Sequence, residues 1–213
     1  MAIQECGFRS RLAQSDKGTT QCVDKLVETQ HIACCKKAVL ERDIENGVDF
    51  DFDYSGSANV PVQFKVRMKH PDIPVVIAQP FWGYGHERTT PGRDLKCLLG
   101  HKTKYHYVGI FDNGCVKSIY YAHSKSVEKE SVKALKVWYE AETNTASSQY
   151  GKSWFTPELV AKWMLKVRNR RIFTLPNGVE IWWKKNDSER FAKLNMYIPM
   201  GLVRGVMVYD SEN

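Results

Sequence analysis

The spacing of apolar and polar positions changes from helical to strand-like within the first half of the chain. Apolar side chains recur at helical spacing after the cap-like pair Ser15-Asp16, which predicts a helix over residues 18–35. Residues 36–42 predict a short strand. Residues 48–54, "VDFDFDY", then alternate strictly between aspartate and aromatic side chains, which is typical of a half-buried strand.

Further strands are expected in the middle of the chain, at residues 60–68, 73–82, 105–111 and 115–123. The last two flank Asp112-Asn113-Gly114, a strong signal for a β-hairpin. A short helix is predicted near Pro91-Gly92, after a glycine-rich loop. An amphipathic helix is predicted over residues 126–142, with Ser126 as its N-cap.

The polar segment 143–153 is the best candidate for an internal boundary. We therefore expect residues 1–150 to form the main domain and residues 151–213 to form a small α+β extension packed on it. The elements predicted in the extension are a helix at 156–168, a hairpin turning at Asn177-Gly178, a short helix at 188–195 and a strand at 202–209. The order of elements predicts a mixed α/β fold with an antiparallel hairpin in its core.

Composition narrows the class of protein. The chain has 213 residues, 43% of them apolar, which favours a packed core over disorder. No apolar run approaches the roughly 20 residues of a membrane span, and the N-terminus lacks a signal-peptide core. The six cysteines form no CxxC pair, which argues against a zinc site or a disulfide framework and favours a reducing, cytoplasmic setting.

The basic charge is concentrated near the C-terminus. The net charge is +7, and residues 151–213 contribute 11 of the 31 basic and 6 of the 24 acidic side chains, a balance of +5. This asymmetry favours a polyanionic partner such as nucleic acid, although ordinary solubility charge would look similar.

A candidate active site lies in the segment 48–67. A hairpin turning near Gly56-Ser57 pairs residues whose numbers sum to about 112 to 113, so Asp49 lies opposite Gln63 or Phe64. Gln63 and Lys65 share a face because strand side chains alternate. A carboxylate, an amide oxygen and an ammonium group then converge, which suits Mg²⁺-assisted phosphodiester hydrolysis. The alternative is a solvated strand face with a Lys–Asp pair.

The other side chains of this strand are assigned less directly. Asp51 and Asp53 share the face of Asp49 but run toward the turn, so we expect a solvated outer face, with Asp51 as a spare ligand. The aromatic residues Phe50, Phe52 and Tyr54 are expected in the core. The histidines His101 and His106 have no third ligand at a recognisable spacing and are expected to be surface or core residues.

The segment "NGVDFDF", a turn and "VPVQFKVR" resemble the core of PD-(D/E)xK nucleases, in the branch where glutamine replaces the last acid. The lead-in "DKGTTQCVDKL" is similar to the start of that branch's first helix, and "YHYVGIFDNGCVKSIYYAHSKSV" to its later hairpin. The resemblance covers about residues 16–140. It implies a restriction-endonuclease-like mixed sheet flanked by helices, dependence on Mg²⁺ or Mn²⁺, and cleavage of DNA.

The resemblance also implies site residues. Asp49 matches the motif aspartate, Gln63 the variant acid and Lys65 the motif lysine, with Asp49 and Gln63 as metal ligands. The family usually draws another carboxylate from the first helix, and here that position falls near Gln21-Cys22, where no acid stands. Asp24, as a metal ligand, and Glu28, as a catalytic residue, could substitute because they are four residues apart on that helix.

Several basic side chains are candidates for nucleic-acid contact. They are Arg67 in the motif strand, Arg88 and Arg93 in the glycine-rich loop, and Arg170, Arg171 and Lys184 in the basic extension. The neighbouring Trp182-Trp183 fits either DNA contact or a structural or dimer interface.

Three functions remain open from sequence. The first is a Mg²⁺-dependent nuclease, in which DNA is the expected substrate, RNA is the second candidate and a homodimer is conceivable. The second is a catalytically inactive protein on the same fold that binds nucleic acid. The third is a small interaction or assembly protein that shares only the fold.

Overall fold

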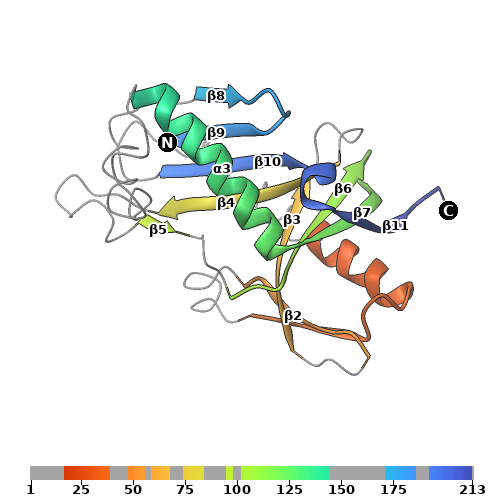
Figure 1. The fold of residues 1–213 in the computed structure, drawn as a ribbon. Coiled ribbons are helices and arrows are strands. Elements are labelled where there is room, and N and C mark those ends of the chain that lie inside the picture. Colours follow the sequence, from red (N-terminus) through yellow and green to blue (C-terminus); the bar gives the residue numbers. More distant parts are fainter. Residues whose placement is uncertain are drawn as a thin grey trace, which may run out of the picture.

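The computed structural model describes residues 17–38, 48–55, 59–67, 74–83, 95–97, 102–143, 171–185 and 192–212 (Figure 1). Two helices are described, at 17–28 and α3 (Ser124–Thr143), with a short 3-10 helix η2 (Met200–Val203). The strands are β1 (Cys34–Lys37), β2 (Phe50–Asp53), β3 (Val60–Arg67), β4 (Val75–Gly83), β5 (Leu95–Cys97), β6 (Tyr105–Asp112), β7 (Cys115–His123), β8 (Arg171–Thr174), β9 (Glu180–Lys185), β10 (Ala192–Pro199) and β11 (Val206–Asp210). None of the described helices is long and apolar enough to cross a membrane.

The first sheet has six strands in the order β1-β2-β3-β6-β7-β11. All neighbours are antiparallel except β3 and β6, which are parallel. The three N-terminal strands therefore form an antiparallel meander, and the chain leaves the sheet before it returns in β6, since a parallel neighbour needs a crossover connection.

The second sheet has five strands in the order β5-β4-β10-β9-β8, all antiparallel. The crossover between β3 and β6 contains β4 and β5, so this excursion supplies two strands of the second sheet. Helix α3 lies across the strands of the second sheet in Figure 1. Its buried residues, Leu135 and Trp138 among them, pack with apolar side chains of β4, β9 and β10 and also with Val108 and Ala122 of the first sheet.

Helix 17–28 packs on the opposite face of the first sheet. Its buried residues Cys22, Val23 and Leu26 join a core cluster with side chains of β2, β3, β6 and β7. The approach is close, because a Cβ on Gly109 of β6 would overlap the Cys22 sulfur. A glycine at this position therefore lets the helix lie directly on the sheet.

The two faces of the first sheet differ in chemistry because strand side chains alternate. We call the face under helix 17–28 the aromatic face, since it carries Phe52, Phe64 and Tyr107. The other face carries Gln63, Lys65 and Arg67 on β3, and we call it the polar face. Helix α3 packs on the polar face over β6 and β7. The polar side chains of this face lie on the neighbouring strands β2 and β3.

Much of the expected secondary structure is confirmed, and the α/β class with it. The hairpin at Asn113-Gly114 joins β6 and β7, and the turn at Asn177-Gly178 joins β8 and β9. Gly114 and Gly178 have φ values of 83° and 82°, the left-handed region that glycine tolerates. Helix α3 begins at Ser124 rather than Ser126.

Several expected elements differ from the structure. The strand expected at 202–209 begins only at Val206, because Met200–Val203 form η2 and Arg204 has a φ of 53°. The first helix ends at residue 28 rather than 35, because the chain turns at Gln30, which has a φ of 57°, and then enters β1. Of the short helix predicted at 188–195, residues 188–191 lie outside the described part of the chain and residues 192–195 are instead the start of β10. Leu194, Met196 and Ile198 are fully buried at a spacing of two between β4 and β9, so pairing with two neighbours overrode the local helical propensity.

The C-terminal strands are shared between both sheets. Strand β10 lies between β4 and β9, and β11 pairs with β7. Strands from both sides of the boundary expected near residue 150 are thus hydrogen-bonded to each other. The expected helices near Pro91-Gly92 and at 156–168 lie outside the described residues.

Candidate functional site

The expected register of the motif hairpin is confirmed. Phe50 pairs with Val62 and Phe52 with Val60, so the next position outward sets Asp49 across from Gln63. The backbone around Asp49 is held on both sides, since its N–H donates to the Val62 carbonyl (2.9 Å) and its carbonyl accepts from the Ala38 N–H (3.0 Å). Asp49 therefore stands at the end of β2 between two strands.

The carboxylate of Asp49 has two described partners. The backbone N–H of Phe64 donates to Oδ2 at 2.6 Å. The ammonium of Lys65 donates to the same oxygen at 3.1 Å and lies 3.4 Å from Oδ1. These bonds orient the carboxylate, and hydrogen bonds to an ionised group are stronger than those between neutral groups.

The ion pair is partly open to solvent. The Lys65 side chain is 29% exposed and that of Asp49 is 16% exposed. A pair at this depth can be reached by a substrate, and its ammonium keeps donors for a further anion. The alternative, a solvated strand face with a Lys–Asp pair, also predicts this ion pair. The Asp49 carboxylate is in addition tied to the backbone of the neighbouring strand, so it is only partly solvated.

Gln63 is buried beside this pair, with 2% of its surface exposed. Its amide oxygen Oε1 has no hydrogen-bond partner among the residues that the structure describes. An amide oxygen buried without a partner costs roughly 1–3 kcal/mol, so such an atom in a folded protein calls for an explanation. A bound cation or water at this oxygen would remove the cost.

The donor set fits a hard cation such as Mg²⁺. Asp49 and Gln63 offer a carboxylate and an amide oxygen, and Mg²⁺ is commonly held by one or two protein oxygens while it keeps several waters. Within the described ranges, no group of three or more histidine, cysteine or acidic side chains could hold a metal ion. Among the described residues, Asp49 and Gln63 are the ligands that would hold the ion, and water would complete its shell.

Asp51 and Asp53 do not form the solvated outer face that the sequence predicts. Asp51 is only 8% exposed, and Oδ1 of Asp53 is buried with no hydrogen-bond partner in the described part of the chain. The reason is that β1 pairs with β2 and sets Lys36 and Cys34 opposite them, so β2 is not an edge strand. The aromatic residues of the same strand pack in the core cluster, as expected.

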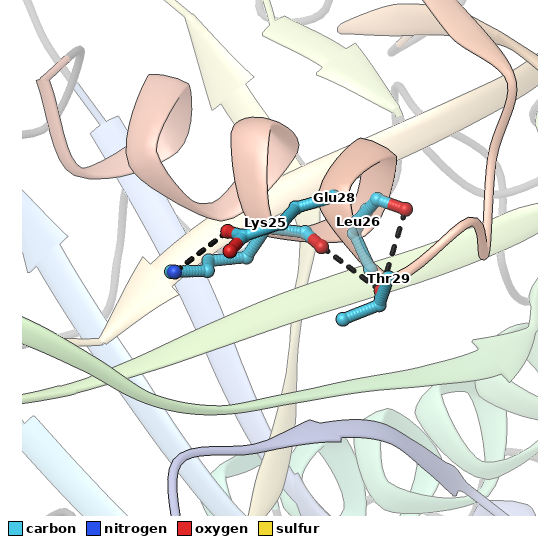
Figure 2. A network of polar contacts seen from close by, with 4 residues as sticks. All are labelled: Lys25, Leu26, Glu28 and Thr29. Carbon is cyan, nitrogen blue, oxygen red and sulfur yellow. Dashed lines mark hydrogen bonds and ion pairs between the residues drawn. The ribbon is translucent and has the colours of Figure 1, made fainter.

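The structure does not bring Asp24 and Glu28 to Asp49. Both stand on helix 17–28, which covers the aromatic face, whereas Asp49 contacts Lys65 on the polar face. Glu28 accepts a hydrogen bond from Lys25 at 2.7 Å on the exposed side of the helix (Figure 2). The negative charge of Asp24 acts instead on Cys35 of β1, whose thiol pKa is raised mainly by burial and also by this neighbour.

Arg67 extends the polar face toward the second sheet. Its guanidinium lies 5.5 Å from the ring centre of Tyr197 on β10, and burial lowers its pKa. Tyr197 in turn lies 5.3 Å, centre to centre, from Trp182, whose indole N–H donates to Glu180 at 3.0 Å. The Arg67 guanidinium thus lies near the Tyr197 ring and near the Glu180 carboxylate.

The remaining basic candidates are placed only in part. Arg171 lies in β8 and Lys184 in β9, both in the second sheet. Arg88, Arg93 and Arg170 lie outside the described residues. Their expected contact with nucleic acid stays a prediction.

Sequence reasoning missed a buried polar network next to Gln63. His106 of β6 is the direct neighbour of Gln63 across the parallel pair. Its Nδ1 lies 2.9 Å from the Ser124 hydroxyl, which lies 3.0 Å from the Thr103 hydroxyl. All three side chains are buried. A link between residues 63 and 106 depends on the parallel pairing of β3 with β6, which local sequence patterns do not reveal.

Comparison of the chain with protein-family models, with curated protein sequences and with solved structures finds no match. The chemistry of the site therefore carries the functional argument.

Proposed function

We propose that this protein is a metal-dependent nuclease of the PD-(D/E)xK kind that hydrolyses phosphodiester bonds in DNA. The observation that carries the proposal is the arrangement of three neighbouring residues. The Asp49 carboxylate is held by the Phe64 N–H beside the Lys65 ammonium, and the unpaired amide oxygen of Gln63 lies across the strand pair. These are the ligand types and the cation that such hydrolysis needs.

The strand topology supports the same proposal at the level of the fold. A helix precedes an antiparallel meander, β1-β2-β3, and β6 then joins β3 in parallel. This agrees with the four-stranded mixed sheet that the resemblance implies. The second sheet and the placement of β11 are additions to that pattern.

Each residue has a distinct role in the proposed mechanism. Asp49 and Gln63 would hold Mg²⁺, which when bound polarises a phosphoryl oxygen and lowers the pKa of bound water. Lys65 can donate a hydrogen bond to a phosphate oxygen and stabilise the negative charge that develops there. The Phe64 N–H keeps the Asp49 carboxylate in one orientation, which reduces the reorganisation needed during the reaction.

A cleavage assay tests the proposal directly. Supercoiled plasmid is incubated with protein and Mg²⁺ or Mn²⁺, and wild type is compared with Asp49→Ala and Lys65→Ala. Lys133→Ala is a matched control, because it removes a lysine from an ion pair of 2.7 Å on α3. Metal-dependent nicking that is lost in the two site variants and kept in the control is the expected result. Nicking that survives in Lys65→Ala would contradict the assignment.

The second candidate function is nucleic-acid binding without cleavage. The observation that favours it is that Asp24 and Glu28 lie on the helix over the opposite face, so the described residues supply two ligands to the site rather than three. Salt-sensitive DNA binding with no nicking in either metal would support this candidate over the nuclease.

A further inference from the structure

The aromatic face has an end that helix 17–28 does not fully bury. Four rings gather there, from the end of β2, the start of β6 and the end of β7: Tyr54, Tyr105, Tyr121 and His123. We call these four rings, together with Lys104, the Tyr105 surface. The three tyrosines are partly exposed and His123 and Lys104 are exposed, in contrast to the buried Tyr107 next to them.

Tyr105 is the centre of this surface. Its ring lies 4.7 Å from that of His123, 5.2 Å from that of Tyr121 and 6.0 Å from that of Tyr54, measured between ring centres. The ammonium of Lys104 lies 5.4 Å from the same ring centre. Aromatic groups from three strands therefore stand side by side, with a cation over the central ring.

The rings are fixed by the packing behind them. Tyr54 and Tyr107 share a hydrogen bond of 2.6 Å between their hydroxyl oxygens, and the Tyr107 hydroxyl lies 2.9 Å from Nε2 of His31. Tyr107 and Tyr121 stack at 5.3 Å between ring centres. Little side-chain entropy would be lost when a ligand binds such a preorganised set of rings.

The charge next to the rings of β6 and β7 is positive, whereas Asp53, which precedes Tyr54, lies on the polar face because strand side chains alternate. The two segments that form this end of the sheet, 102–106 and 121–126, carry Lys102, Lys104 and Lys125 and no acidic side chain. All three lysines are exposed. The ligand that this combination fits has flat apolar groups and a negatively charged backbone.

We propose that the Tyr105 surface binds a single strand of nucleic acid, with bases stacked on Tyr105 and His123 and phosphates next to Lys102, Lys104 and Lys125. Stacking platforms on sheets combined with basic side chains are how proteins hold single strands without reading their sequence. A duplex keeps its bases stacked on each other and cannot offer their faces to these rings. The surface therefore prefers single strands over duplexes.

This binding does not depend on the proposed cleavage. The Tyr105 surface lies on the aromatic face, and Asp49 and Lys65 meet on the polar face of the same sheet. The site gives the nuclease proposal a second contact for an unpaired strand, and it would also serve a protein that binds without cutting.

The test is fluorescence anisotropy with labelled strands in EDTA, where metal-dependent cleavage is absent. The probes are oligothymidylate and oligouridylate of about 15 nucleotides and a duplex of the same length, at about 50 mM salt. Wild type is compared with Tyr105→Ala, Tyr105→Phe, His123→Ala and Lys104→Ala. Tyr209→Ala is the matched control, because Tyr209 of β11 is a partly exposed tyrosine outside the Tyr105 surface, with the Lys25 ammonium 5.9 Å from its ring centre.

Wild type is expected to bind a single strand more tightly than the duplex. Tyr105→Ala and His123→Ala should each weaken single-strand binding roughly fivefold or more, since a stacked base contributes about 1–3 kcal/mol. Tyr105→Phe should keep the affinity, and Lys104→Ala should reduce the salt dependence, because it removes one phosphate contact. Comparison of the two oligonucleotides shows whether DNA or RNA is preferred.

Three outcomes would overturn the proposal: duplex binding as tight as single-strand binding, an unchanged affinity in His123→Ala, or an equal loss in Tyr209→Ala. His123 is exposed at the end of a strand, so its variant keeps the test informative even if Tyr105→Ala folds poorly. Single-strand binding without plasmid nicking would uphold this proposal and contradict cleavage, so the two proposals fail separately.

Discussion

The ammonium nitrogen of Lys65 lies 3.1 Å from Oδ2 of Asp49, the same oxygen that accepts a hydrogen bond from the backbone N–H of Phe64. One carboxylate oxygen thus joins the end of β2 to two successive residues of β3. Asp49 therefore contributes to the stability of the fold as well as to the proposed catalysis. Different substitutions of Asp49 should separate these two roles.

We expect Asp49→Ala to lower the free energy of unfolding by about 1–3 kcal/mol, because it leaves the Phe64 N–H and the Lys65 ammonium without their acceptor. Asp49→Asn keeps an oxygen for the N–H and should lower the free energy of unfolding less, although both variants should lose metal-dependent nicking. Urea unfolding followed by circular dichroism measures the difference. Equal stability of the two variants would contradict the structural role of this hydrogen bond.

Gln63 provides a test for metal binding that does not depend on activity. Gln63→Leu removes the unpaired buried oxygen, so in EDTA its melting temperature should equal or exceed that of wild type. Wild type should gain stability on addition of Mg²⁺ or Mn²⁺, because a ligand that binds the folded state stabilises it, and Gln63→Leu should lose most of this gain.

Gln63→Glu is the matched partner of that variant. It places a second carboxylate across from Asp49, so its melting temperature in EDTA should fall and its gain with Mg²⁺ should exceed that of wild type. Differential scanning fluorimetry in both conditions gives the comparison. Identical responses of all three proteins to metal would remove Gln63 from the ligand set.

The close approach of helix 17–28 to the sheet predicts a cost for any side chain at position 109. Gly109→Ala should destabilise the protein by about 1–3 kcal/mol, because the new methyl group would overlap the Cys22 sulfur. Cys22→Ala in the same chain should recover part of this loss. A double-mutant cycle from chemical denaturation measures the coupling, and additive effects would mean that the two residues do not share this contact.

His31 gives the stability of the protein a dependence on pH. Burial lowers the pKa of its imidazole, and its Nε2 lies 2.9 Å from the Tyr107 hydroxyl. The unfolded chain, with a histidine pKa of about 6.5, therefore binds a proton more readily than the folded chain, so stability falls as pH drops through that value. The folded protein therefore favours the neutral imidazole, whose Nε2 can accept a hydrogen bond from the Tyr107 hydroxyl.

The measurement is the free energy of unfolding between about pH 7 and pH 5, in wild type and His31→Gln. The variant should lose less stability over this interval, because glutamine does not titrate. A steeper loss in His31→Gln would reverse the sign and refute the assignment.

Local patterns were sufficient to predict the motif hairpin, the two later hairpins and α3. Turn residues, the alternation of Phe50, Phe52 and Tyr54, and the helical spacing of apolar residues all act over short stretches of chain. These patterns therefore also placed Asp49 across from Gln63. They misjudged β10, whose helical propensity was overridden by pairing with two strands. Local patterns did not show that Asp24 and Glu28 lie away from the site, because the face that a helix covers depends on tertiary packing.

The tertiary structure also placed His106 next to Gln63, buried Asp51 through the pairing of β1 with β2, and brought together the rings of the Tyr105 surface. Each of these depends on strand neighbours distant in sequence, and long-range pairing is set by the packing of the whole core rather than by any local pattern.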